Sequence, residues 1–290
     1  MMSKKKIILW IPQGRLGNLL FQYQAVNKLY KNSVIFTIDQ GLNQMFNLKR
    51  KVTFFKVPKI LESRVLTIYS YLLKSMVKHK IFSHVTPKVF NVTNDQNDED
   101  KSISYEKGFF KNIIVFDGFF QNEIYLHDKP EINQYILQEA KNITNKYVNY
   151  KKIAIHVRFG DYENISLLGN DNLSLPIDFY TNCINKMKSN FTNCIFIVFS
   201  DDIVKAKKMF SSYKDFVFIG QTDQNFDFAA ISICDSAIIS ASTFSWWASS
   251  YISSSDKLIL APKFWLGFKA NIWFPKYIRS NFINYVDVFK

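Results

Sequence analysis

The chain has 290 residues, of which 48% are hydrophobic and 21% are charged, with only nine Gly and seven Pro. This composition predicts one large or two ordinary folded domains with a substantial core, and it excludes a disordered, collagenous or low-complexity protein. The three cysteines (Cys183, Cys194 and Cys234) are too few for a disulfide scaffold and favour a reducing cytosol.

No stretch is typical of a transmembrane helix. The longest uncharged run, Ser236–Ser255, has twenty residues, but nine are Ser and one is Thr, so a bilayer core would solvate it poorly. The apolar run Ile7–Ile11 is shorter than the core of a signal peptide and is typical of a first buried strand. We therefore expect a cytoplasmic protein.

Short β-branched or aromatic runs alternate with longer helical patterns along the chain. We expect strands at Ile7–Ile11, Ser33–Ile38, Ile113–Asp117, Lys152–Val157, Cys194–Phe199, Phe216–Ile219, Ser236–Ile239 and Lys257–Ala261. We expect helices at Leu19–Tyr30, Glu131–Tyr147, Asp178–Lys188, Asp202–Phe210, Asp227–Cys234 and Phe244–Ile252, and an exposed loop at Asn91–Lys107. Strands separated by helices predict parallel sheets with helices on both faces.

Positive charge gathers in one segment. Residues 49–88 hold ten Lys or Arg and one Glu, which gives +9 of the chain's net charge of +13. Apolar residues between 60 and 77 fall mostly at helical spacing, which predicts a basic amphipathic helix. Two interpretations stay open: a core-packed helix with a solvated basic face, or a surface that contacts anionic lipid at the inner face of the cell membrane. No nucleic-acid recognition motif accompanies this charge, so nucleic acid is not an expected partner.

The first candidate site is the segment PQGRLGNLLFQY at residues 12–23. A strand leads here into a loop with two glycines, Gly14 and Gly17, and then into a helix whose N-terminus offers free N–H groups to an anion. A tight turn alone would explain two glycines, but Arg15 and Asn18 between and after them favour a loop that faces phosphate. The third glycine of a dinucleotide fingerprint and the Gly-Lys-Ser/Thr of a P-loop are missing, which argues against an oxidoreductase.

The second candidate site is IHVRFGDY at residues 155–162. A buried strand ends here in an imidazole (His156), a guanidinium (Arg158) and a carboxylate (Asp161), and ligands of open parallel sheets bind beyond the carboxyl ends of strands. Arg158 can hold a phosphate through two hydrogen bonds. The other three histidines form no metal-ligand pattern with His156, so no metal site is expected.

Two further groups follow later strands. In Phe199-Ser200-Asp201-Asp202, either carboxylate can serve simply as the N-cap of the next helix. In the segment from Asp227 to Tyr251, a strand runs into a hydroxyl-rich turn that contains Ser242, Thr243, Phe244 and Ser245. Hydroxyls and N–H groups of this kind suit a diphosphate without a metal ion. We expect the following Trp246 and Trp247 to pack in the core.

Together these blocks resemble the α-1,2-fucosyltransferase family of bacterial type, glycosyltransferase family 11. The family's Gly-x-x-Gly-Asn-x-x-Phe-Gln-Tyr, His-x-Arg-Arg-Gly-Asp-Tyr, Phe-Ser-Asp-Asp and Ser-Thr-Phe-Ser-Trp-Trp are similar to residues 14–23, 156–162, 199–202 and 242–247. Two smaller blocks, at residues 117–123 and 259–265, are similar as well. The six matches occur in order between residues 14 and 265.

The resemblance implies an α/β, GT-B-like fold with two Rossmann-like domains whose parallel sheets face each other across a cleft. We expect an N-terminal acceptor-side domain at residues 1–148 and a C-terminal GDP-sugar-binding domain at 149–290, with the segment after residue 270 as a candidate to cross back. The implied enzyme is inverting, needs no metal or other cofactor, and moves fucose from GDP-fucose to a hydroxyl, O2 of a galactose-type sugar, in a surface glycan such as an O-antigen.

The resemblance also assigns roles to residues. Arg158 contacts the donor phosphate, Asp227 and the turn of Ser242, Thr243, Phe244 and Ser245 hold the nucleotide together with His156, and the loop of Arg15, Gly17 and Asn18 faces the donor from the other domain. Asp161 is the candidate general base, with a structural partnership to Arg158 as the alternative.

One position departs from the family pattern. Phe159 stands where the family usually has a second arginine, which leaves another GDP-deoxyhexose, such as GDP-colitose, open as the donor. A non-catalytic module that binds a nucleotide sugar or a glycan also stays open. The acceptor is an oligosaccharide, and a lipid-linked one would fit the basic segment.

Overall fold

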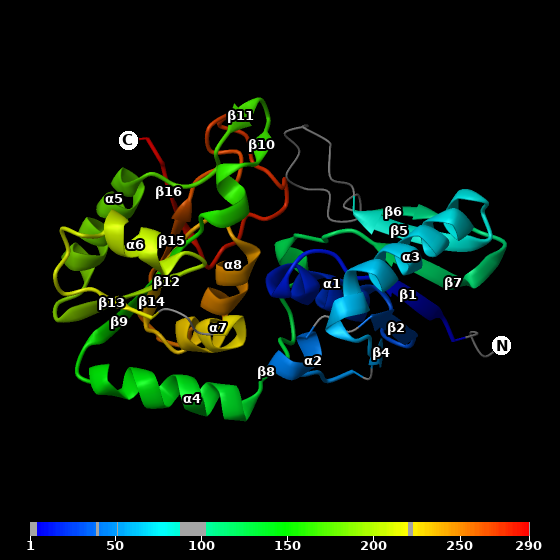
Figure 1. Ribbon diagram of the computed structural model, residues 1–290, viewed down its shortest axis with the longest axis horizontal. Helices are drawn as coiled ribbons and strands as arrows, with labels where there is room; N and C mark the ends of the chain where they lie inside the picture. The colour runs from blue at the N-terminus through cyan, green and yellow to red at the C-terminus, as the bar shows by residue number, and fades with distance from the viewer. Residues whose placement is uncertain (1–4, 39–40, 51, 88–102, 220–222, 290) are drawn as a thin grey trace. The chain divides into compact units, whose positions relative to one another are not determined.

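The computed structural model describes residues 5–38, 41–50, 52–87, 103–219 and 223–289. Contacts divide the chain into two compact units, residues 1–131 and residues 132–290. Each unit contains one six-stranded sheet and its own helices (Figure 1).

The sheet of the first unit has the strand order β4-β2-β1-β7-β5-β6. All neighbouring pairs are parallel except β5 and β6, which are antiparallel. Its strands are β1 (Ile7–Ile11), β2 (Val34–Ile38), β4 (Val52–Phe55), β5 (Phe82–Pro87), β6 (Ile103–Glu106) and β7 (Phe110–Asp117), with the short β3 (Phe46–Asn47) outside the sheet. Because β1 lies between β2 and β7, the chain winds outward from it in both directions.

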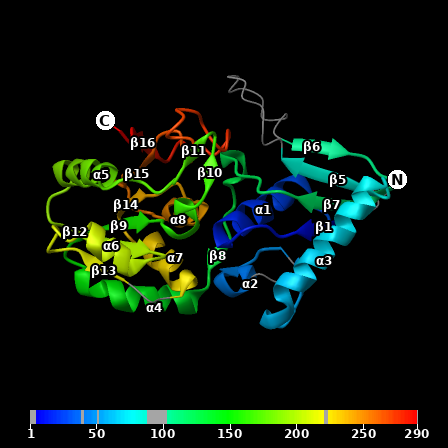
Figure 2. The same cartoon turned by 45° about the horizontal axis from the view of Figure 1, so that its top comes forward.

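Three helices belong to this unit: α1 (Leu16–Leu29), α2 (Leu42–Met45) and α3 (Lys59–Lys78). Leu73 of α3 packs against Ile11 of β1 and Val115 of β7, with Tyr69 and Val77 beside it, so α3 covers the sheet at these strands (Figure 2). All five residues of β1 are apolar, and Ile8, Trp10 and Ile11 are fully buried. A central parallel strand covered on both faces needs such a continuous apolar run.

The sheet of the second unit has the strand order β13-β12-β9-β14-β15-β16 and is parallel throughout. Its strands are β9 (Lys151–Val157), β12 (Cys194–Ser200), β13 (Val217–Phe218), β14 (Ser236–Ile239), β15 (Ile259–Pro262) and β16 (Asn284–Val286), and two short pairs of residues, β10 (Ser166–Leu167) and β11 (Asn170–Asp171), form a hairpin. Numbered along the chain, the order is 3-2-1-4-5-6, the arrangement of a doubly wound dinucleotide-binding sheet.

The helices of the second unit are α4 (Gln134–Thr144), α5 (Ile177–Asn190), α6 (Ile203–Met209), α7 (Gln224–Ser232) and α8 (Thr243–Ser250). Phe179 and Ile184 of α5 share a core with Phe210 after α6 and with Ile155 and Val198 of the sheet. Figure 2 shows α5 on one side of this sheet and α4 on the other. Right-handed crossovers between parallel strands produce this division.

The structure confirms the expected α/β class and every predicted strand, with small shifts at the ends. Four predictions need correction. The helix expected from Glu131 begins at Gln134, because Asn133 caps it and Glu131–Ile132 form the short strand β8. The helices expected from Leu19 and Asp227 each begin three residues earlier, at Leu16 and Gln224. The loop expected at Asn91–Lys107 ends in β6, while residues 91–102 lie outside the described part of the chain.

The three thiols all lie in the second unit. Cys183 and Cys234 are buried and Cys194 is half-buried, and none forms a disulfide. Trp246 and Trp247 are fully buried, which confirms their expected place in the core. None of the described helices is long and apolar enough to cross a bilayer.

Candidate functional site

The best-defined polar site lies where the strand order of the second sheet reverses. β9 comes first in the chain, β12 and β13 follow on one side of it, and β14 begins the other side, so the carboxyl ends of β9 and β14 flank the switch point. Ligands of doubly wound sheets bind at this crevice. Ile239 pairs with His156 in the β9–β14 register, and the loops after both strands start at this place.

His156 is buried at this switch point. Its Nδ1 lies 2.8 Å from the Ser240 hydroxyl oxygen, and its ring is 5.5 Å from that of Phe244 on α8. Burial, with a further contribution from the charge of Arg158, lowers the pKa of His156 to about 3. The imidazole is therefore neutral at physiological pH, and it connects β9 to the turn that begins α8.

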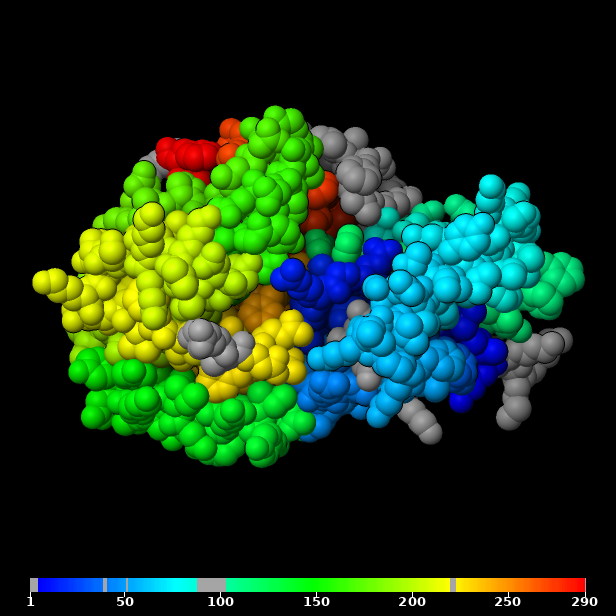
Figure 3. Space-filling view, viewed as in Figure 1, coloured from blue at the N-terminus to red at the C-terminus, as the bar shows by residue number. Residues whose placement is uncertain are grey.

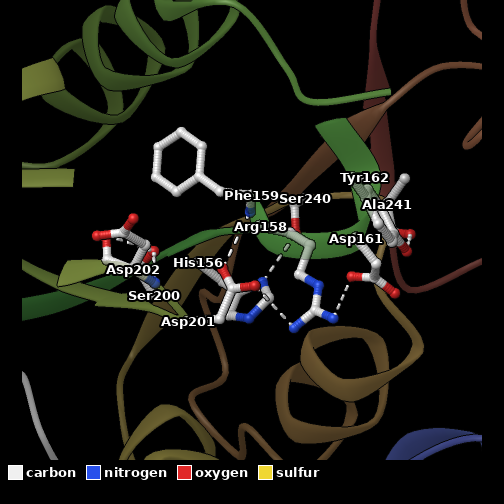
Figure 4. Close-up of polar contacts among 10 residues, drawn as sticks. All are labelled: His156, Arg158, Phe159, Asp161, Tyr162, Ser200, Asp201, Asp202, Ser240 and Ala241. Atoms are coloured by element: carbon white, nitrogen blue, oxygen red, sulfur yellow. Dashed lines mark hydrogen bonds and ion pairs between the residues drawn. The ribbon is translucent and has the colours of Figure 1, made fainter. Parts of the chain in front are cut away.

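Arg158 projects from the end of β9 between two carboxylates (Figure 4). Its Nη1 lies 3.0 Å from Oδ2 of Asp201, and its Nη2 donates to Oδ1 of Asp161. The guanidinium side chain is 13% exposed, so it is largely but not completely shielded from water. Its planar fork keeps each N–H in a defined direction, which suits recognition of phosphate.

Asp201 and Asp202 have different tasks although they are neighbours. Asp202 is the N-cap of α6, because its Oδ1 accepts from the backbone N–H of Lys205 at 2.9 Å. Asp201 instead faces Arg158, and its Oδ1 accepts from the backbone N–H of Phe159 at 3.0 Å. Asp201 thus belongs to the site, because the carboxyl end of β12 lies beside that of β9. Sequence reasoning could not establish this.

The turn after Arg158 requires glycine. Gly160 has a φ of +35°, and a Cβ at this position would lie 2.6 Å from Oδ2 of Asp201. The following short helix, Gly160–Glu163, holds Asp161, and its Tyr162 hydroxyl donates to the carbonyl of Ala241 at 2.8 Å. The loops after β9 and β14 are therefore joined at two points, by His156 and by Tyr162.

The hydroxyl-rich turn forms the N-terminus of α8, as expected. Ser242 is its N-cap in an extended conformation, and Thr243 is the first helical residue. The hydroxyl of the fully buried Ser245 donates to the carbonyl of Ser242 at 3.2 Å, so this side chain stabilises the turn. The Phe244 ring meets Phe228 of α7 edge-on at 5.6 Å. Asp227 immediately precedes Phe228 in the first turn of α7.

The Gly14–Asn18 loop lies at the corresponding place in the first unit, between the carboxyl ends of β1 and β7. Gly14 has a φ of +76°, a conformation that favours glycine, and Gly17 lies in the first turn of α1. Arg15 is the exposed N-cap residue of α1, and no acidic side chain lies in the first turn. Among the described residues, its guanidinium has no ion-pair partner. A cation beside a helix N-terminus makes this loop electropositive.

The amide of Gln22 holds this loop in shape. It is fully buried, its Oε1 accepts from the backbone N–H of Gln13 and from Nε1 of Trp10, and its Nε2 donates to the carbonyls of Gln13 and Asn18 at 2.7 and 3.0 Å. The Asn18 side chain in turn accepts from Gln121 Nε2 in the loop after β7, at 2.7 Å. Gln22 is thus a structural support of the loop, and Oδ1 of Asn18 joins the loop to Gln121.

Within the described ranges, no group of three or more His, Cys, Asp or Glu side chains is arranged to hold a metal ion. At the carboxyl ends of its central strands, each sheet carries one guanidinium: Arg158 in the second unit and Arg15 in the first. Sequence reasoning had identified the strands and glycines that place both side chains.

Comparison with known proteins decides the family. The sequence pattern of glycosyl transferase family 11 matches residues 7–271, most of the chain. The chain belongs to glycosyltransferase family 11. It is therefore a glycosyltransferase, as the resemblance of its motifs implied.

Two relatives of this family 11 chain come from Escherichia coli. The O-antigen biosynthesis glycosyltransferase WbnK is 23% identical over 283 residues, which cover 87% of this chain and 92% of WbnK. An α-1,2-colitosyltransferase is 32% identical over 169 residues, which cover 54% of this chain and 58% of that enzyme.

Solved structures share the fold. The apo form of POFUT1 has a TM-score of 0.53 at 13% identity, with 90% of this chain and 99% of POFUT1 covered. POFUT1 in complex with GDP-fucose has a TM-score of 0.52 at 12% identity, with 89% and 98% covered. This similarity confirms the expected GT-B-like α/β fold of the family 11 chain.

One polar cluster of the family 11 chain escaped sequence reasoning. Asp117 ends β7, and its carboxylate accepts from the Gln13 side chain and lies 3.4 Å from Lys74 Nζ of α3 and 3.9 Å from His84 Nε2 of β5. Burial is the main cause that lowers the pKa of His84. The patterns around Asp117, Gln13 and Lys74 each predicted a local element, and none of them indicated that these segments meet.

Proposed function

We propose that this family 11 glycosyltransferase moves fucose from GDP-fucose to a glycan hydroxyl with inversion at the anomeric carbon. The observation that carries the proposal is Arg158, a guanidinium fixed at the switch point of a doubly wound sheet, where nucleotide ligands bind. POFUT1, which shares the fold, has been crystallised with GDP-fucose. The proposed acceptor position is O2 of a galactose-type sugar in a surface glycan.

We assign donor binding to the residues that the motifs single out. In the second domain, Arg158 binds the diphosphate, while His156, Asp227 and the N-terminal turn of α8 (Ser242, Thr243, Phe244 and Ser245) bind the rest of the nucleotide sugar. In the first domain, Arg15, Gly17 and Asn18 bind the donor as well. The first domain, predicted from the sequence at residues 1–148, binds the acceptor, and the second, predicted at 149–290, binds the donor.

The proposed reaction is a direct displacement. The acceptor oxygen attacks C1 of the sugar, the bond from C1 to the β-phosphate oxygen breaks, and its electron pair stays on the departing GDP. The acceptor proton passes to the carboxylate of Asp161. Arg158 stabilises the charge that develops on the leaving diphosphate, a contribution typically worth about 10²–10³-fold in rate. Because guanidinium groups carry this charge, the proposed reaction requires no metal ion.

A second candidate donor is GDP-colitose. An α-1,2-colitosyltransferase is 32% identical to just over half of this chain, and Phe159, where fucosyltransferases of the family usually carry arginine, is buried beneath the Lys205 ammonium at 5.1 Å. The two sugars differ in one ring hydroxyl, so a pocket built to hydrogen-bond that hydroxyl would discriminate between them.

A donor and acceptor screen tests the proposal. The purified protein is incubated with GDP-fucose, GDP-colitose or GDP-mannose and a set of galactose-terminated oligosaccharides, and the products are measured by mass spectrometry. We expect a product one deoxyhexose heavier than a β-galactoside acceptor, and one equivalent of GDP released per product. Binding of GDP without transfer to any acceptor would support the non-catalytic module instead.

We further propose that α3 brings the enzyme to the cytoplasmic face of an anionic membrane, where a lipid-linked acceptor would lie. Its outer face exposes five large apolar residues at helical spacing: Ile60, Leu61, Ile68, Tyr71 and Leu72. In the space-filling view, α3 (light blue to cyan) is on the surface of its unit (Figure 3). Arg64 and Lys78 fall on the same face by their spacing. Apolar and basic side chains on one helix face suit an anionic interface.

A further inference from the structure

The charges around Arg158 do not balance. One guanidinium faces two carboxylates, Asp161 and Asp201, so the cluster has a net charge of −1 before any ligand arrives. The diphosphate of a nucleotide sugar adds further negative charge at the same place. Since like charges a few ångströms apart repel each other strongly when partly shielded from water, the cluster as it stands opposes the ligand that Arg158 would bind.

The two carboxylates are not held equally. The Asp201 side chain is 22% exposed, accepts from the backbone N–H of Phe159 at 3.0 Å and lies directly against Gly160. The Asp161 side chain is 50% exposed, and among the described residues its carboxylate has Arg158 as its only partner. Asp161 can therefore leave without breaking any other contact of its carboxylate, whereas Asp201 cannot.

The two terminal nitrogens of the Arg158 guanidinium contact different carboxylates. Nη1 faces Asp201 and Nη2 faces Asp161. If Asp161 leaves, Asp201 still orients the planar group through Nη1, and the Nη2 side of the fork becomes available to a phosphate oxygen.

We propose that Asp161 is a displaceable counter-ion, which occupies Nη2 of Arg158 in the free enzyme and is released when the donor diphosphate takes its place. Release leaves the Asp161 carboxylate without the guanidinium that it pairs with in the free enzyme, so it can accept the acceptor proton. The inference rests on the proposed function, because it takes Arg158 as the diphosphate ligand. It implies an ordered reaction in which the donor binds before the acceptor can be deprotonated.

The first test is the affinity for GDP, measured by calorimetry for the wild type, Asp161→Asn and Asp201→Asn. Asp161→Asn removes the competing charge and should bind GDP about tenfold more tightly, since a nearby like charge is lost. Asp201→Asn loses the orienting contact and should not gain affinity. The matched control is Glu163→Gln, which also removes one negative charge. Glu163 lies two residues from Asp161 but pairs with Lys205 rather than with Arg158. It should stay within about twofold of the wild type, because a surface ion pair contributes little.

The second test is turnover with saturating donor. Asp161→Asn should lose about 10²-fold or more in kcat despite its tighter GDP binding, as expected for loss of a general base. Equal or weaker GDP binding by Asp161→Asn would overturn the displacement, and unchanged kcat would overturn the base role. A wild type that does not bind GDP at all would instead contradict the proposed function, so the two failures are distinguishable.

Discussion

The guanidinium of Arg158 is the side chain on which the proposed chemistry depends most directly, and its contacts determine what a substitution should do. Arg158→Ala should lower transfer by at least about 10²-fold, because charge on the departing diphosphate loses its stabilising partner. Arg158→Lys should recover little of this, since an ammonium cannot make the paired contact. Initial rates with GDP-fucose, alongside a circular dichroism spectrum to verify folding, would measure the effect. Near-normal turnover in a folded Arg158→Ala protein would refute the assignment.

Gly160 provides a test of the contact between the turn and Asp201. Gly160→Ala places a Cβ against the Asp201 carboxylate at a positive φ, so we expect a transfer rate at least about tenfold lower, through misplacement of Asp201 and Arg158. Gly169→Ala is the matched control: Gly169 has a φ of +74°, but a Cβ there would meet no neighbour within 4 Å. It should lose stability through backbone strain and keep its transfer rate. Equal losses of rate in both variants would mean that strain alone matters.

His156 makes the stability of the fold depend on pH. Its pKa is about 3 in the folded protein, because burial disfavours the charged ring, against about 6.5 when unfolded. The unfolded chain therefore binds a proton that the folded chain does not, and stability is lost as the pH falls from about 6.5 toward 3. Between pH 7 and pH 5, the wild type should lose roughly 2 kcal/mol more than His156→Asn, measured by urea unfolding. The same pH slope for both proteins would contradict a buried neutral His156.

Sequence reasoning at the residue scale succeeded where a motif fixed a side chain directly after a strand. His156 lies near the end of β9, and Arg158 and Asp161 follow it. Arg158 pairs with Asp161, whereas His156 contacts Ser240. It failed to separate Asp201 from Asp202, because which of two adjacent carboxylates caps a helix depends on where its first turn begins. The pairing of Asp117 with Lys74 and His84 was equally hidden, since those residues meet only once the sheet has formed.

Helix α3 exposes an apolar and basic face on its outer side, and its charges can be tested separately. Arg64→Glu with Lys78→Glu should weaken sedimentation with phosphatidylserine vesicles about tenfold or more, since each basic residue near the surface contributes roughly 1 kcal/mol. Lys74 is a poor choice for this experiment because it pairs with Asp117. The variants should keep normal transfer to a soluble acceptor.

Lys207→Glu with Lys208→Glu on α6 is the matched control, with the same change of net charge on another exposed helix. It should sediment like the wild type. Binding of the wild type should also fall at high salt and disappear with neutral lipid. Equal loss in both double variants would reduce the effect to net charge, and no binding to anionic vesicles would remove the membrane role while leaving the transferase proposal intact.

The central strands were predictable, and most strands at the edges of the sheets were not. Strands such as β1, β9 and β12 are covered on both faces, so a continuous apolar run in the sequence predicts each of them. Four strands of the two large sheets were missed, β4, β5, β6 and β16, and they lie at or next to a sheet edge. The two-residue strands β3, β8, β10 and β11 were missed as well. Edge strands are short and half-covered, and backbone hydrogen bonds to a neighbour hold them whatever their side chains. β6, for example, has only four residues, Ile103–Glu106, at the end of a polar stretch, so its brief alternation is a weak signal.

At the scale of the whole molecule, each unit places an arginine at the switch point of its own sheet, and the proposed donor meets cationic groups in place of a metal ion. We expect GDP to bind equally well in EDTA and in Mn²⁺, with an affinity that falls as salt is added because phosphate contacts dominate. Calorimetry in both buffers measures this. Binding that vanishes with the chelator and returns with Mn²⁺ would contradict the metal-free proposal.

The distribution of thiols offers a way to observe the first unit by itself. The chain has no cysteine before Cys183, and burial raises the pKa of both Cys183 and Cys234 to about 12, so neither forms the reactive thiolate at neutral pH. Only Cys194 is left to react with a maleimide dye. In a Cys194→Ala background, Tyr71→Cys would therefore carry a single fluorophore on the exposed face of α3. Its emission would report directly when that helix leaves water for a lipid surface.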